Sequence, residues 1–75
     1  MADAVYAVVP VEGEAGWLVN KGTTSLSRHG TEEEAVEAAW KLCLANQPSQ
    51  LMVHDREGEV TMRRRFDVSP PAGLG

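Results

Sequence analysis

Three side chains are the natural candidates for metal binding or nucleophilic chemistry in this 75-residue chain: His29, His54 and Cys43. A structural zinc site takes four ligands, and a Cys–His pair needs an accessible thiolate beside the imidazole. The expected elements keep the three apart, because Cys43 falls on the buried face of a helix, His29 precedes that helix and His54 points outward from a strand. We therefore predict no metal site, no cofactor and no catalytic cysteine, and we expect His29 to make local hydrogen bonds where the helix begins.

Acid–base catalysis needs carboxylates that converge across a cleft with shifted pKa values. The carboxylates that cluster here lie at successive positions of the expected helix, where they diverge and suit the helix dipole: Glu32, Glu33, Glu34 and Glu37. Gly13 and Gly16 are not followed by a helix, which indicates turns more than a phosphate cradle. With no nucleophile elbow, no phosphate-binding loop and no room for a deep pocket, we expect a non-enzymatic protein with no small-molecule substrate.

The run Arg63-Arg64-Arg65 is the one cluster of basic residues in an acidic chain. In a strand, Arg63 and Arg65 share the outer face with His54, so these three residues are candidates for contact with an anion or single-stranded nucleic acid. Charges on an exposed strand also prevent edge-to-edge aggregation, which is the interpretation we favour. The net charge of −4 and the pI near 5.0 argue against general affinity for nucleic acid or an anionic membrane.

Residues 29–46 are expected to form the one helix. Thr31 can accept from the backbone N–H of Glu34, and the Glu34 carboxylate can reach back to the N–H of Thr31. At about 100° per residue, one face gathers small and apolar side chains, with Val36 on its border: Ala35, Ala39, Leu42, Cys43 and Asn46. A narrow stripe of small residues favours packing on a sheet, and Pro48 ends the helix by about residue 47.

Trp40 and Leu44 fall outside this stripe, on its far flank beside the charged face. Large apolar groups in such a position cover a sheet edge, a chain terminus or a partner protein. Two interpretations stay open, in which Trp40 folds over its own domain or contacts a partner. Trp40 and Leu44 are therefore our candidate partner-contact residues.

The remainder of the chain is expected to form two β-hairpins. Residues 5–9 and 17–21 pair in the first, and residues 22–28 form a polar link to the helix. Residues 51–55 and 59–66 pair in the second. A three-residue loop there would mix polar and apolar side chains, whereas a two- or four-residue loop places the apolar ones on one face: Leu51, Val53, Val60 and Met62, with Phe66 at the strand end.

The expected fold is therefore α+β, with the order β-β-α-β-β and a four-stranded antiparallel sheet that carries the helix on one face. We expect residues 1–66 to form a single domain and residues 67–75 to form a disordered Pro/Gly-rich tail. One cysteine, no signal peptide and no long apolar run favour a cytoplasmic protein without a membrane span.

Several local patterns occur together in this order: Val8-Val9-Pro10, Gly16-Trp17-Leu18-Val19, His29-x-Thr31-x-x-Glu34-Ala35, Leu51-x-Val53-His54 and Gly58-x-Val60. Over residues 5–66 the chain resembles the small bacterial proteins grouped as domain of unknown function 2188. Trp40, where a smaller or polar residue is more typical, and the Pro-rich tail depart from that pattern. The resemblance implies a four-stranded sheet carrying one helix, and it implies no reaction and no catalytic residues.

Two functional hypotheses follow from these observations. The first is a small cytoplasmic interaction module that binds another protein or itself, as a homodimer, through Trp40 and Leu44. The second is a nucleic-acid-binding accessory protein that uses the strand face of Arg63 and Arg65. The missing catalytic residues and the small size, at which dimerisation commonly adds stability, favour the first.

Overall fold

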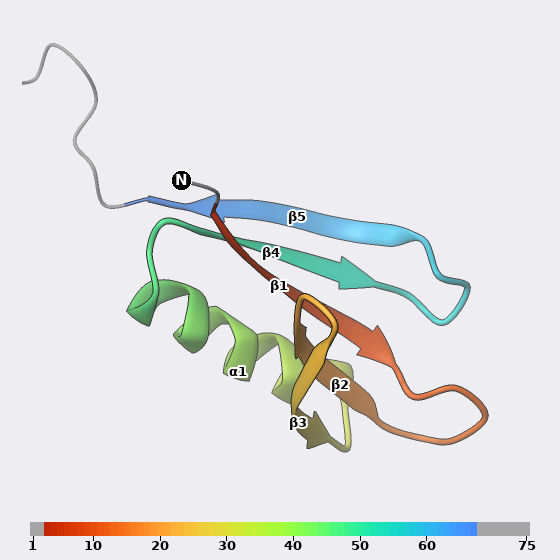
Figure 1. The fold of residues 1–75 in the computed structure, drawn as a ribbon. Helices are drawn as coiled ribbons and strands as arrows, with labels where there is room; N and C mark the ends of the chain where they lie inside the picture. The colour runs from red at the N-terminus through yellow and green to blue at the C-terminus, as the bar shows by residue number, and fades with distance from the viewer. Residues whose placement is uncertain (1–2, 68–75) are drawn as a thin grey trace, which may run out of the picture.

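The structure, a computed structural model, describes residues 3–67 and places one helix on one side of a five-stranded sheet (Figure 1). The sheet order is β3-β2-β1-β4-β5. The elements are β1 (Ala4–Pro10), β2 (Trp17–Lys21), β3 (Thr24–His29), α1 (Glu32–Ala45), β4 (Ser49–His54) and β5 (Val60–Phe66).

The α+β class and the single helix are confirmed, but the four-stranded antiparallel sheet is wrong in two respects. The segment expected to be a polar link, residues 22–28, contains all of β3 except its last residue, His29, and this strand pairs antiparallel with β2. Its register shifts at Val19/Asn20, and Leu26 remains 44% exposed. An edge strand with little to bury lacks the alternation by which strands are recognised, so its polar composition hid it.

The second difference is that β1 and β4 pair in parallel, with Tyr6 beside Leu51 and Val8 beside Val53. The hairpin predictions could not reveal this contact, because it joins segments that lie on either side of the helix in the sequence. α1 returns the chain across the sheet, so β4 starts at the same end as β1. The N-terminal strand therefore lies in the middle of the sheet.

The core forms where the small-residue face of α1 meets the sheet. Ala35, Ala39 and Cys43 are fully buried, as the helical stripe predicted. They pack against apolar side chains that alternate along the three central strands: Tyr6, Val8, Val19, Leu51 and Val53. Small side chains on α1 allow its axis to lie close to these strands, which fixes the helix over the centre of the sheet.

The ends of α1 agree with the sequence, except in one bond of the cap. Thr31 Oγ1 accepts from the Glu34 backbone N–H at 3.2 Å, as predicted. The reciprocal contact differs, because the Thr31 hydroxyl donates to Glu34 Oε1 at 3.3 Å in place of the backbone N–H. At the other end, Asn46 Nδ2 donates to the Leu42 carbonyl at 2.8 Å and satisfies one of the last backbone acceptors.

The β4–β5 turn has the three-residue loop that the sequence argument rejected. The Asp55 N–H donates to the Glu59 carbonyl at 2.8 Å, and His54 lies opposite Val60. A bulge then shifts the register, so that Val53 lies opposite Met62 and the apolar phase is restored. The prediction misassigned Val60, which is 40% exposed on the side of His54.

Most of the expected tail, residues 68–75, lies outside the described residues. Asp67 is described and pairs with Arg65, whose Nη1 lies 2.9 Å from Asp67 Oδ2. At the other terminus, β1 begins at Ala4, one residue before the strand expected over residues 5–9.

Candidate functional site

An open groove of about 670 Å³ runs between α1 and β5. We call it the α1–β5 groove. Its helix wall and sheet floor are lined by Glu32, Glu33, Val36, Glu37, Trp40, Lys41, Leu44, Val53, Thr61 and Met62. Both candidate partner-contact residues, Trp40 and Leu44, are among them.

The groove exists because α1 is centred over β1, β2 and β4, whereas the sheet continues to β5. The helix therefore leaves the inner face of β5 only partly covered. Val53 and Met62, which lie opposite each other on β4 and β5, form the apolar floor. On the helix wall, Leu44 is 51% exposed, the largest exposed fraction among the described large apolar residues. An uncovered apolar surface of this kind is typical of a binding groove.

Trp40 is held by its own domain and also forms part of the wall. Its ring meets that of Phe66 edge-on, with centroids 4.9 Å apart and planes at 86°. The guanidinium of Arg64 lies over the Trp40 ring at 4.7 Å. Trp40 thus folds over its own domain at the end of β5, which is one of the two interpretations that the sequence left open. Its ring is held as a rigid surface beside Leu44.

The helix rim of the groove is acidic. Glu32 and Glu33 lie in the first turn of α1, and Glu37 follows one turn later. Among the described residues that line the groove, the only cation is Lys41, whose Nζ lies 3.5 Å from Glu37 Oε1. Both side chains of that pair are about three-quarters exposed, at 75% and 73%, so the pair contributes little to stability. A ligand that enters from this side meets negative charge around an apolar floor.

The candidate anion residues lie on the opposite face of the sheet. In the register of β5 with β4, Arg63 lies opposite Met52 and Arg65 lies opposite Gln50. Both arginines are therefore on the same face of the sheet as His54. Arg64 lies on the helix side, as its contact with Trp40 shows. The structure therefore brings His54, Arg63 and Arg65 to one face as predicted, and separates Arg64 from them.

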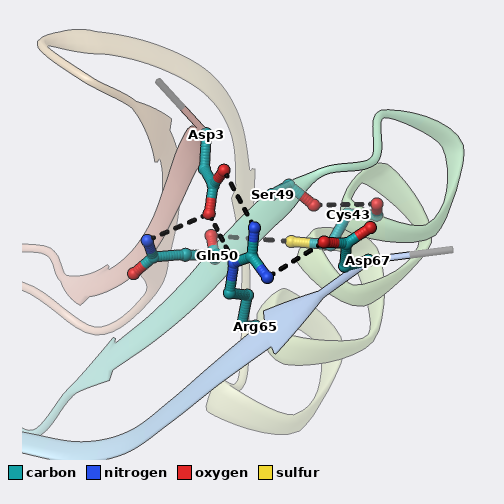
Figure 2. Close-up of polar contacts among 6 residues, drawn as sticks. All are labelled: Asp3, Cys43, Ser49, Gln50, Arg65 and Asp67. Carbon is teal, nitrogen blue, oxygen red and sulfur yellow. Dashed lines mark hydrogen bonds and ion pairs between the residues drawn. The ribbon is translucent and has the colours of Figure 1, made fainter. Parts of the chain in front are cut away.

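Arg65 is already engaged by carboxylates. Figure 2 shows its guanidinium between Asp3 and Asp67, the first and last residues that the structure describes. Arg65 Nε donates to Asp3 Oδ2 at 2.8 Å, and Asp67 lies on the other side. Gln50 Nε2 donates to the same Asp3 oxygen at 3.3 Å. The hydrogen bond from Arg65 holds the pKa of Asp3 below its ordinary value. The positive charge available to an external anion on this face is reduced accordingly.

The thiol and the imidazoles lie apart. Cys43 is buried, its Sγ lies 3.7 Å from the Gln50 carbonyl oxygen, and burial raises the pKa of the thiol. His29 Nε2 lies 2.8 Å from Ser27 Oγ within β3, so its hydrogen bond supports that strand and not the helix as expected. Among residues 3–67, no three His, Cys, Asp or Glu side chains come together as metal ligands.

Sequence reasoning found two residues of the groove wall and missed the exposure of its floor. Val53 and Met62 were both assigned to the core by their alternation; Val53 is buried there, whereas Met62 is only partly buried. The position of α1 over the sheet decides how far that cover extends, and it is set by tertiary packing. The small-residue stripe of α1 was the available signal, since it shows that one narrow helix must cover a whole sheet face.

The helix of the described range lacks the length and apolar character of a membrane-crossing segment. A family model described as "Uncharacterized protein conserved in bacteria (DUF2188)" matches residues 6–66. No curated protein and no solved structure matches the chain.

Proposed function

The chain belongs to the bacterial DUF2188 family, and from this premise we propose that it is a non-enzymatic interaction module that binds protein through the α1–β5 groove. The observation that carries the proposal is the apolar groove floor, left open where α1 stops short of β5. The first partner to consider is a second copy of the chain, in the cytoplasm.

Three features of the groove support protein binding. The half-buried Met62 on its floor and the exposed Leu44 on its wall provide apolar area to bury. The ring of Trp40 is fixed by Phe66, so little side-chain entropy is lost when it is covered. Charged residues surround this apolar centre, an arrangement typical of protein interfaces.

The geometry also suits a two-fold dimer. If two α1 flanks pack antiparallel, the glutamate-rich start of each helix lies near the Lys41 end of the other. Opposite charges then face each other at both ends of the contact, while Leu44 of each copy covers apolar surface of the other.

Light scattering on the purified chain from low to high micromolar concentration tests the proposal. We expect a concentration-dependent dimer that Leu44→Glu converts to monomer with unchanged circular dichroism. Leu26→Glu is the matched control, because Leu26 is a similarly exposed leucine, at 44%, on the far side of α1. A parent that stays monomeric, or two variants that behave alike, would contradict self-association through the groove.

The nucleic-acid hypothesis is tested separately. Because Arg65 is paired with Asp3 and Asp67, we expect no salt-sensitive binding to mixed oligonucleotides at low ionic strength. Saturable binding that weakens with salt and is lost in Arg63→Gln would restore that hypothesis.

A further inference from the structure

The two edges of the sheet differ in how they avoid pairing with another chain. β3 is a short edge whose pairing with β2 is interrupted by a register shift, and irregular strands make poor templates. β5 has seven residues and is regularly paired with β4 from Met62 to Phe66. Within residues 3–67 no strand pairs with its outer side. Its backbone there presents unpaired donors and acceptors to solvent.

Charge protects the part of the β5 edge from Met62 to Phe66, and this protection is directed against copies of the same strand. In a two-fold antiparallel pair centred on Arg63, that residue lies opposite its own copy. A pair centred on Arg64 places Arg64 opposite Arg64 and Arg63 opposite Arg65. Like charges directly opposite each other destabilise strand pairing. If the two-fold axis is moved toward the β4–β5 turn, the paired region includes the bulge beside Met62, which interrupts the register.

Protection by charge is selective, because a strand of opposite charge is attracted by the same basic run. Arg63 carries most of this attraction, since Arg65 is already paired with Asp3 and Asp67. We propose that the β5 edge receives an extended acidic segment of a partner protein as a sixth strand of the sheet. The inference rests on the proposed function, since the side chains of that strand would reach the α1–β5 groove. It specifies the partner chemistry: carboxylates alternating with apolar residues.

The alternation follows from the faces of β5. Arg63 and Arg65 point to the face away from α1, so the added strand needs acidic side chains on that face. Met62 points to the helix side beside the groove floor, so the added strand needs apolar side chains there. Backbone hydrogen bonds would supply affinity, and the two sets of side chains would supply specificity.

The test uses a capped synthetic peptide of the length of β5, seven residues, in which Glu and Val alternate. Titrated into isotope-labelled protein at low salt, it should shift the amide resonances of Arg63 and Arg64 saturably and dissociate any dimer that uses the groove. The same peptide with Lys in place of Glu should not bind. Binding by both peptides, or shifts confined to β3, would overturn the proposal.

Backbone pairing is separated from charge attraction by two N-methylated peptides, one methylated on every Glu amide and one on every Val amide. Successive residues of a strand direct their N–H groups to opposite edges, so only one of the two peptides should lose binding. If both bind as well as the parent peptide, no strand is added. Equal loss in both would also overturn the proposal.

Matched variants locate the site. Arg63→Glu should weaken binding by about tenfold or more, whereas Arg28→Glu, on the opposite edge strand, should leave it unchanged. Equal weakening would show that only net charge matters and would overturn the proposal. If the peptide fails to bind while Leu44→Glu still abolishes self-association, strand addition is refuted and the proposed function stands. If self-association is also absent, both are refuted.

Discussion

Replacing Trp40 by Leu tests how strongly the groove wall is held by its own domain. Leu preserves helix propensity and apolar character, but removes the edge-on contact with Phe66 and the ring beneath Arg64. An edge-to-face aromatic pair contributes about 0.5–1.5 kcal/mol, and a partly exposed cation–π contact about 0.5–1 kcal/mol. The free energy of unfolding should therefore fall by about 1–2.5 kcal/mol.

That loss is large for this domain, since 75 residues correspond to a total stability of about 4–11 kcal/mol. With a urea dependence of about 1 kcal/mol per molar for so small a domain, the unfolding midpoint should fall by about 1 M or more. Circular dichroism at a concentration where the parent is monomeric is the assay, because it measures the domain and not an interface.

A double-mutant cycle assigns part of the loss to Arg64. Arg64→Gln keeps much of the side-chain stem and removes the charge, and its coupling to Trp40→Leu should be about 0.5–1 kcal/mol. Lys41→Gln, at an exposed neighbouring position, should have no coupling to Trp40→Leu. A Trp40→Leu variant that unfolds at the midpoint of the parent would refute this account of the wall, and strictly additive losses would refute the Arg64 contact.

Three further changes test other parts of the fold. Thr31→Ala should lower the unfolding free energy by about 1 kcal/mol in urea denaturation, and an unchanged midpoint would contradict the observed cap. Cys43 should react with a thiol reagent far more slowly in native than in unfolded protein, because it is buried; equal rates would place it on the surface. The pKa of Asp3 is lowered in the fold, so the stability lost in Asp3→Asn should be complete above the ordinary aspartate pKa, about 4, and should vanish as the pH falls through the lower folded value. A difference that is constant with pH would show that Arg65 does not favour the charged form of Asp3.

The helix and the strand at residues 17–21 were predictable because their signals are local. The Thr31 cap, the stripe at Ala35, Ala39 and Cys43, and the proline that follows all act within a few residues. β3 was missed because an exposed edge strand carries no hydrophobic period. The parallel pairing of β1 with β4 was missed because it joins distant segments, a contact that no local pattern encodes.

The candidate site shows the same division. Trp40 and Leu44 were identified because large apolar groups beside charges stand out in a helical projection. Val53 is a core residue as its alternation predicts, whereas Met62 only looks like one, and the lateral placement of α1 leaves it partly open. The hairpin argument failed at Val60 because a bulge can change the phase of a strand, which strict alternation does not allow.

The central position of β1 makes the fold divisible. Within residues 3–67, β2 and β3 lie on one side of it and β4 and β5 on the other, and each of these pairs is a local hairpin. In this described part of the chain, no hydrogen-bonded ladder links the two hairpins except through β1, whose Ala4 pairs with Ser49. If the chain is cut between β1 and β2, the larger fragment therefore lacks its central strand. One edge of β2 and one edge of β4 are then left unpaired. A synthetic β1 should reassociate with the remaining fragment, so the domain offers a natural split point for a two-piece complementation reporter.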